Sequence, residues 1–173
     1  MAATSMSALP IPACGPRRCR SVAAESTWRG CPCRRRPARG RDEGLHVMER
    51  HNLNPPGMTF AGMSQGVARG GLIHISGQVS LDQGKVVGIG DAVAQARQCF
   101  VNIEEVLRLA GATLDDVVAL RCYLVDARHY ADYALVKNAL FADNPPCGTA
   151  VVVKELLSPD FLLEVEAVAQ RSL

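Results

Sequence analysis

Regular patterns of hydrophobic and polar residues begin near residue 48 and continue to the end of the chain. Short runs bounded by turn residues predict strands, and Gly70-Gly71 separates two of them as the turn of a hairpin. A further turn with a short returning strand is expected over SLDQGKVVG, residues 80–88. The first three predicted strands are residues 49–54, 66–70 and 72–76.

Apolar residues then recur at helical spacing in two segments. Asp91 precedes the first segment as an N-cap, whose carboxylate accepts from free N–H groups of the first turn, and Gly111 follows as a stop signal. Residues 130–141 predict the second helix, which ends before Pro145-Pro146. The two apolar stripes are Val93, Ala96, Phe100, Ile103, Leu107 and Ala110, and Tyr133, Val136 and Leu140.

Three strands accompany these helices. VVALRCYLV, residues 117–125, is apolar nearly throughout, which indicates burial on both faces. TAVVVKELL (149–157) and FLLEVEAVA (161–169) predict the last two strands. This order of elements predicts an α+β fold with a mixed β-sheet and two helices packed on one face. The other sheet face stays uncovered and fairly apolar, which favours contact with another subunit.

Residues 1–47 form a different kind of sequence. They hold nine arginines, no lysine and three acidic residues, a net charge of +6, without apolar periodicity. This composition predicts a disordered tail in front of a domain formed by residues 48–173. Organelle targeting, weak contact with nucleic acid, and translation that starts at Met48 stay open as interpretations of the tail. A metal site at Cys14, Cys19 and the CPC motif would lack a histidine ligand.

Charge and composition narrow the classes of function. Residues 48–173 carry ten basic and fourteen acidic residues, a net charge of −4. This charge argues against nucleic-acid binding, because a protein surface that binds phosphates is usually a basic patch. No apolar stretch approaches the roughly 20 residues of a membrane span. Cys99, Cys122 and Cys147 are spread through apolar patterns. This placement is typical of the reduced thiols of a cytoplasmic protein. We therefore expect a cytoplasmic protein, or an organelle protein if the tail is a transit peptide.

Four stretches of the core carry a family resemblance. MSQGVARGGLIHISGQVSLDQGKVVG runs from a turn into a Ser-Gly-Gln strand end, and QARQCFVNIEEVLRLAGATLDDVVALRCYLVD combines a helix with the following strand. FADNPPCGTAVVV and LLEVEAVA supply the last strands. In order and spacing these stretches resemble the YjgF/RidA family of imine deaminases and endoribonuclease L-PSP-like proteins, over nearly all of residues 48–173.

The resemblance implies a chorismate-mutase-like fold and a homotrimer with three clefts between subunits. Deaminases of this family hydrolyse reactive enamines and imines derived from amino acids to keto acids and ammonia, without a cofactor. The core has no His, Cys, Asp or Glu cluster at metal-ligand spacing and no dinucleotide-binding turn. Neither a metal nor a cofactor is therefore expected.

The chain departs from the family pattern at several site positions. Gly148 stands where the deaminases have an Arg that holds the substrate carboxylate through two hydrogen bonds. Met63 replaces the family's Tyr, Ala134 an Asn, and Ala150 a small thiol or hydroxyl residue. Cys147 lies beside the lost Arg position. Met63, Ala134, Cys147 and Gly148 are therefore candidate ligand-binding residues in a roomier, less polar cleft.

Three candidate residues keep the family pattern. The equivalents of Ser76 and Gly77 line the cleft, and the equivalent of Glu164 positions or activates water for attack on the imine carbon. From the residues alone, Glu164 and Glu166 face one side of a strand about 6.5–7 Å apart, either as an acid–base pair or as solvated carboxylates. Ser76 has only His74 near it, parallel on the same strand, which disfavours nucleophilic catalysis.

No cation obviously replaces the missing Arg. Lys154 shares the predicted strand face of Gly148 but lies about 20 Å along it, and the sequence does not determine the direction of Arg121. Three functions stay open. The first is hydrolysis of a small imine, enamine or related metabolite at Glu164, and the second is a non-catalytic trimer that binds a small ligand. The third, RNA cleavage, is disfavoured by the acidic core and the absence of a His pair.

Removing residues 1–47 should leave the stability of the core unchanged, because a tail of this composition buries little apolar surface. Thermal melts of the full chain and of a chain that starts at Met48 should agree within about 1–2 °C. A larger loss on truncation would show that the tail packs on the core.

Overall fold

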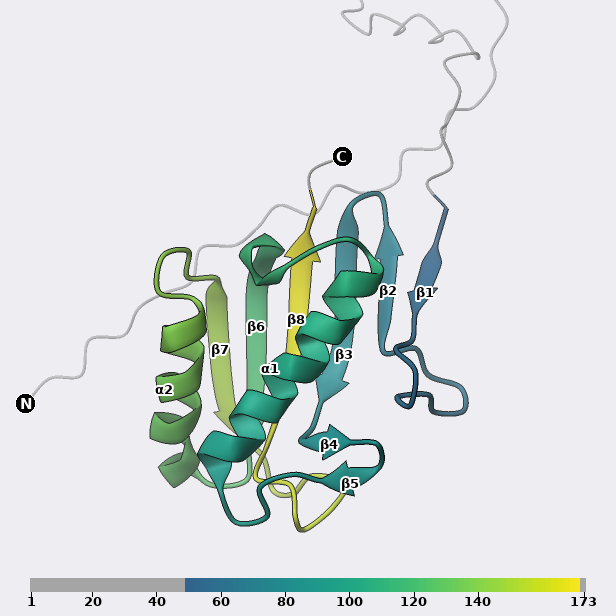
Figure 1. The fold of residues 1–173 in the computed structure, drawn as a ribbon. Coiled ribbons are helices and arrows are strands. Elements are labelled where there is room, and N and C mark those ends of the chain that lie inside the picture. The colour runs from purple at the N-terminus through teal and green to yellow at the C-terminus, as the bar shows by residue number, and fades with distance from the viewer. Residues whose placement is uncertain (1–48, 172–173) are drawn as a thin grey trace, which may run out of the picture. The chain divides into compact units, whose positions relative to one another are not determined.

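The computed structural model describes residues 49–171 (Figure 1). The predicted tail, residues 1–47, lies outside this range together with its cysteines. The strands and helices are β1 (His51–Leu53), β2 (Gly66–Arg69), β3 (Leu72–Gln78), β4 (Leu81–Asp82), β5 (Lys85–Val86), α1 (Ala92–Leu109), β6 (Val117–Leu124), α2 (Tyr130–Leu140), β7 (Cys147–Val152) and β8 (Leu163–Gln170). Short 3₁₀ turns at Leu114–Asp116 and Ala127–His129 precede β6 and α2.

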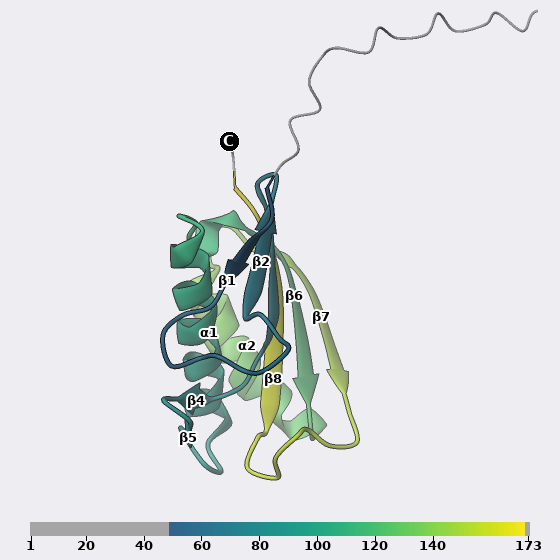
Figure 2. The ribbon, with the colours of Figure 1, turned by 90° about the vertical axis from the view of Figure 1, so that its right-hand side faces the viewer.

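Six strands form one mixed sheet in the order β1-β2-β3-β8-β6-β7. Neighbouring strands are antiparallel except β6 and β7, which run parallel and are joined through α2. Both helices pack on one face of this sheet (Figures 1 and 2). The predicted α+β fold, with a mixed sheet and two helices on one face, is therefore confirmed. Strands β4 and β5 pair separately beside the end of β3.

The side chains of β8 alternate between a face of the sheet that the helices cover and a face that they leave open. Leu163, Val165, Ala167 and Ala169 alternate along the strand, and each is at most 2% exposed beneath the helices. Because successive strand side chains point to opposite faces, Glu164 and Glu166 lie on the open face. The hydrophobic core therefore sits between the sheet and the helices. Phe100 of α1 anchors the second helix, with ring centroids 6.2 Å from Tyr133 and 5.8 Å from Phe141.

Local signals in the sequence explain how the elements begin and end. An Oδ1 atom of Asp91 accepts a 3.0 Å hydrogen bond from the backbone N–H of Ala94, which caps α1 as predicted. In the hairpin between β2 and β3, Gly70 and Gly71 have φ values of 61° and 81°. Two successive left-handed residues match the right-handed twist of the flanking strands.

Two strand predictions need correction. TAVVVKELL does not continue as a strand to residue 157, since β7 ends at Val152. Its partner β6 ends at Leu124, which is paired with Val152, so no strand is available for the residues beyond. VVALRCYLV is not buried on both faces in the described chain, because Val118 and Arg121 are exposed on the open face.

The open face is fairly apolar, as predicted. Leu72 of β3, Val118 of β6 and Val151 of β7 are all exposed there or at its edge. Within residues 49–171, neither helix combines the length and the apolar character that crossing a membrane requires. The open face thus offers apolar surface for contact with another protein chain.

Candidate functional site

Glu164 lies against Gly77 where β3 and β8 run side by side. A β-bulge between Ile75 and Gln78 shifts the register of β3 against β8 at this point. A Cβ atom built on Gly77 would lie 1.7 Å from Oε1 of Glu164, closer than any two such atoms can approach. The carboxyl group of Glu164 therefore occupies the space that any other residue at position 77 would fill.

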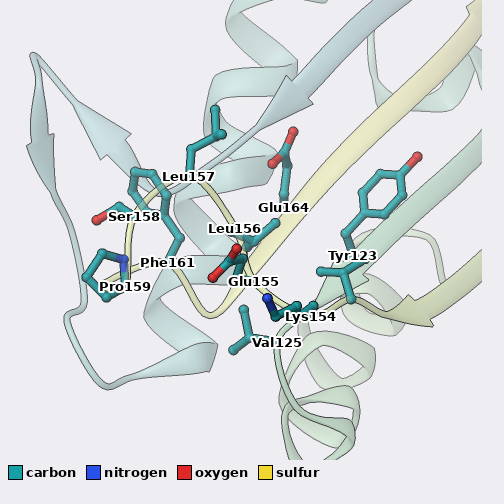
Figure 3. A pocket seen from close by; sticks show the side chains of 11 residues that line it. Tyr123, Val125, Lys154, Glu155, Leu156, Leu157, Ser158, Pro159, Phe161 and Glu164 are labelled. Carbon is teal, nitrogen blue, oxygen red and sulfur yellow. The ribbon is translucent and has the colours of Figure 1, made fainter.

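Two cavities meet at Glu164. The first, of about 950 Å³, lies beside the ends of β6 and β8 and is called the charged cavity below (Figure 3). The second, of about 620 Å³, lies against the loop after β1 and is called the apolar cavity. Glu164, Leu157 and Phe161 line both. The charged cavity is completed by Tyr123, Val125, Val153, Lys154, Glu155, Leu156, Ser158 and Pro159. The apolar cavity is completed by Gly57, Met58, Thr59, Phe60, Met63, Gln65, Gly77, Gln78, Val79, Leu81, Gln83, Gly84 and Asn102.

The surroundings of Glu164 make its carboxyl group hold a proton more tightly. Burial raises the pKa of Glu164, and the nearby negative charge of Glu166 raises it further. Glu166 itself pairs with Arg121 across from it on β6. A half-buried carboxyl group with a raised pKa is a stronger base toward water than an exposed one, and such groups are enriched at catalytic sites.

Tyr123 stands next to Glu164 on the open face. Strand register pairs the two residues directly, and Figure 3 shows both side chains projecting from neighbouring strands. Burial raises the pKa of the Tyr123 phenol, with a further contribution from Glu166. The phenol therefore stays protonated at neutral pH and adds a hydrogen-bond donor to the wall of the charged cavity.

A network of amide side chains fixes the end of β3. Nε2 of Gln78 donates to the carbonyl of Ser76 at 2.9 Å and to Oε1 of Gln65 at 3.0 Å. The backbone N–H of Gln65 donates to Oδ1 of Asn54 at 2.9 Å. Nε2 of Gln65 is buried without a hydrogen-bond partner among the described residues. These bonds hold the loop after β1 against the strand that carries Gly77.

Ser76 is engaged in the same region. Its Oγ donates a 2.8 Å hydrogen bond to the carbonyl of Ser64, so its proton is directed toward the backbone. His74 lies two residues back on the exposed side of β3. This arrangement gives Ser76 the role of positioning the Met63–Gln65 turn and agrees with the expectation that it is not a nucleophile.

The structure brings only some of the predicted site residues together. Met63 and Gly77 line the apolar cavity with Glu164. Cys147 and Gly148 open β7 opposite Ala119 and Leu120, whereas Glu164 is level with Tyr123. At about 3.3 Å per residue, these two lie roughly 10–13 Å along the sheet from Glu164. Within one chain they do not join its cavities.

Ala134 lies in α2, in the helical layer on the covered side of the sheet. It lines neither cavity that Glu164 shares. If Ala134, Cys147 and Gly148 belong to the same site as Glu164, they must come from another copy of the chain.

Of the residues that line the charged cavity, the sequence predicted only Glu164 as a site residue, and the missed residues include the polar side chains of Tyr123 and Lys154. The two-residue period of β6 places Tyr123 on the same face as Arg121, and this period is the sequence signal that could have identified it. The pattern of residues 149–157 predicts that Lys154 lies in a continuing strand, whereas it belongs to the connection after β7 and lines the cavity. No local signal marks it, because the end of β7 depends on where β6 stops.

The described part of the chain offers no evident metal site. No group of three His, Cys, Asp or Glu side chains among residues 49–171 is arranged to hold an ion. Around Glu164, the carboxyl group can transfer a proton, and Tyr123, Lys154 and the cavity amides can form hydrogen bonds with a ligand.

Comparison with known proteins identifies the family. The family model described as endoribonuclease L-PSP matches residues 57–171. The mitochondrial protein mmf1 of Schizosaccharomyces pombe is 33% identical over 122 residues, 68% of this chain and 74% of that protein. A RutC family protein of Pyrococcus horikoshii is 36% identical over 110 residues, 62% of this chain and 86% of that protein.

The fold comparison agrees. A Mycobacterium tuberculosis protein, described as a member of the YjgF/YER057c/UK114 family, superposes with a TM-score of 0.62. It is 31% identical in sequence and covers 70% of this chain and 99% of its own. The architecture is thus the chorismate-mutase-like α+β fold. The chain belongs to the YjgF/RidA family, whose model is named for endoribonuclease L-PSP.

Replacing Glu164 with Gln should stabilise the protein at neutral pH and not at acidic pH. Because folding raises the pKa of Glu164, the folded chain favours the protonated form, and this contribution to stability is lost as the pH rises through the raised pKa. Glutamine resembles the protonated form at every pH. The melting temperature of Glu164→Gln should exceed that of the wild type by about 1–3 °C at pH 7 and match it near pH 3.5.

The matched control for this comparison is Glu155→Gln, which neutralises an exposed carboxylate in the same cavity. It should change the melting temperature by less than Glu164→Gln at pH 7. A destabilised Glu164→Gln at pH 7 would show that the charged form of Glu164 is the one that the fold favours.

Proposed function

We propose that the chain is a hydrolase that deaminates a small imine, enamine or related reactive metabolite. The observation that carries this proposal is the half-buried carboxyl group of Glu164, held over Gly77 at the meeting point of two cavities. Its pKa is raised by burial and by Glu166. A general base whose pKa moves toward neutral pH accepts a proton more effectively while still being available as the carboxylate.

Glu164 would act twice in the reaction. As water attacks the carbon of the C=N bond, the Glu164 carboxylate accepts one proton of the water, and the imine nitrogen takes up a proton to become an amine. The resulting carbinolamine then breaks its C–N bond. Protonated Glu164 returns its proton to the departing nitrogen, and the carbinolamine hydroxyl releases its proton to solvent in place of the one that the imine nitrogen took from solvent, so that one imine and one water give one carbonyl compound and one ammonia. An enamine enters the same course after it gains a proton at carbon.

A homotrimer would complete the site. The open face exposes Leu72, Val118 and Val151, and burying such apolar surface between copies is favourable. Cys147, Gly148 and Ala134 do not reach Glu164 within one chain, so a neighbouring copy is the source from which they could contribute. These observations support the trimer, and clefts between its subunits as the place of reaction.

Gly148 separates this chain from the deaminases that it resembles. No atom lies within 4 Å of a Cβ built at this position, and its φ is not in the left-handed region, so the fold tolerates a side chain there. The absence of an Arg is therefore a difference in chemistry and not a requirement of the backbone. It favours, as a second candidate, a non-catalytic trimer that binds a small ligand.

RNA cleavage receives little support. The open face around the site carries Glu164 and Glu166, whose charges repel phosphates, and the one Arg beside them is paired with Glu166. For location, the relative mmf1 is named as mitochondrial, and an Arg-rich tail is typical of transit peptides. An organelle location is therefore proposed beside the cytoplasmic one.

Ammonia release from freshly generated imines tests the enzymatic proposal. The purified full chain should hydrolyse at least one of a set of imines, some with and some without a carboxylate. Glu164→Gln should lower the rate by about 100-fold or more, because the amide cannot accept a proton from water. Light scattering on the same preparations should give about three times the chain mass of 18.5 kDa.

Gly77→Ala is a second, independent variant. Its methyl group would displace the carboxyl end of Glu164, which is flexible, so activity should fall while the melting temperature changes little. Gly148→Ala, where nothing lies within 4 Å of the added methyl, is the matched control. Undiminished hydrolysis by Glu164→Gln would remove Glu164 as the base, and no ammonia from any imine would favour the binding protein.

A further inference from the structure

The charged cavity contains an ammonium group without a carboxylate partner in the described chain. The ion pairs among residues 49–171 join Arg108 to Glu105, Arg121 to Glu166 and Arg128 to Asp126. Lys154 takes part in none of them. An exposed lysine in a cavity wall that makes no ion pair with a carboxylate of the described residues is available to an anion that enters from solvent.

The fold places Lys154 in this cavity through the end of β7. Val152 is the last residue paired with β6, and the N–H of Val153 still donates to the carbonyl of Leu124 at 2.8 Å. Beyond that bond the chain leaves the sheet and returns to β8 as the wall of the charged cavity. Figure 3 shows Lys154 and Glu155 on this connection, with Tyr123 and Glu164 on the adjoining strands.

The two cavities differ in chemistry on either side of Glu164. Lys154 is the one basic residue among the described residues that line them. The apolar cavity has no charged residue other than Glu164. Its walls combine apolar side chains with uncharged polar ones: the apolar ones are Met58, Phe60, Met63, Val79, Leu81, Leu157 and Phe161, and the polar ones are Thr59, Gln65, Gln78, Gln83 and Asn102. A ligand that spans both cavities would therefore have a hydrocarbon part on one side of Glu164 and a negative charge on the other.

We propose that Lys154 is the specificity-determining residue of this site and binds the carboxylate of a monoanionic ligand whose hydrocarbon chain occupies the apolar cavity. The proposal rests on the proposed function in placing the reactive carbon of the ligand beside Glu164. A cavity of about 620 Å³ lies within the range of small-molecule sites and has room for a side chain of several carbons. The anion would thus bind at a residue other than position 148.

The charge balance of the cavity favours a monoanion over a phosphate ester. Lys154 faces the ligand together with two carboxylic residues, Glu155 and Glu164. A dianion would gain from one ammonium but be repelled by these acids, whereas a carboxylate carries a single charge that Lys154 can balance. A lysine also binds as a point charge, so it does not demand the planar two-bond geometry of an arginine.

Calorimetry with two matched probes tests this proposal on the full chain. The probes are 4-methyl-2-oxopentanoate and its methyl ester, which have the same hydrocarbon part and differ in charge. The wild type should bind the acid more tightly than the ester. Lys154→Gln should weaken binding of the acid about tenfold and leave the ester unchanged, as expected for one charge-assisted bond. Lys154→Arg should keep most of the affinity for the acid.

The control variant is Lys137→Gln, which removes the same charge from α2, away from both cavities. It should bind both probes as the wild type does. Three results would overturn the proposal. Lys154→Gln could lose equal affinity for the acid and the ester, it could lose no affinity for the acid, or the wild type could bind neither probe.

The outcome is separable from that of the proposed hydrolysis, because binding is measured without turnover. Acid binding that depends on Lys154, in a protein that releases no ammonia from imines, would support the anion site and contradict the enzymatic function. Imine hydrolysis that depends on Glu164, together with acid binding that does not depend on Lys154, would support the enzymatic function and contradict the anion site.

Discussion

The two-residue period of β8 is the constraint on which the rest of the structure depends. This strand lies inside the sheet, paired with β3 on one side and β6 on the other. Its alternate residues Leu163, Val165, Ala167 and Ala169 are buried beneath the helices, which fixes the register of the strand. A slip by one residue would bury Glu164 and Glu166 in the apolar core, at a cost of several kcal/mol for each unpaired charge. The hydrophobic core therefore determines the position of the carboxyl group that defines the site.

The close approach of Gly77 to Glu164 places the Glu164 carboxyl group where a ligand could reach it. A bulge in β3 and the absence of a side chain at residue 77 leave room for the Glu164 carboxyl group between two cavities. Partial burial there raises its pKa, and Glu166 adds to the effect although Arg121 is paired with it. The candidate site thus combines a carboxyl group with a raised pKa, the apolar cavity and the Lys154 ammonium group in one chain, whereas Gly148 and Cys147 could join it only from another copy.

Local patterns predicted the elements of the fold well. The helical stripe before Gly111, the cap at Asp91 and the turn at Gly70-Gly71 depend on residues close in sequence, and all three are confirmed. The end of β7 was predicted wrongly because it depends on the length of β6, a distant partner. The same error concealed Lys154. The contact between Gly77 and Glu164 could not be predicted from periodicity either, because it depends on how β3 and β8, two strands far apart in the chain, are aligned.

The most direct test is a titration of the Glu164 carboxyl carbon by ¹³C nuclear magnetic resonance, in the wild type and in Gly77→Ala. We expect the pKa of Glu164 to lie above the ordinary carboxyl range in the wild type. It should fall toward that range in Gly77→Ala, because the added methyl group pushes the carboxyl group toward solvent. An ordinary pKa in the wild type, or the same raised pKa in both proteins, would contradict the role assigned to the space over Gly77.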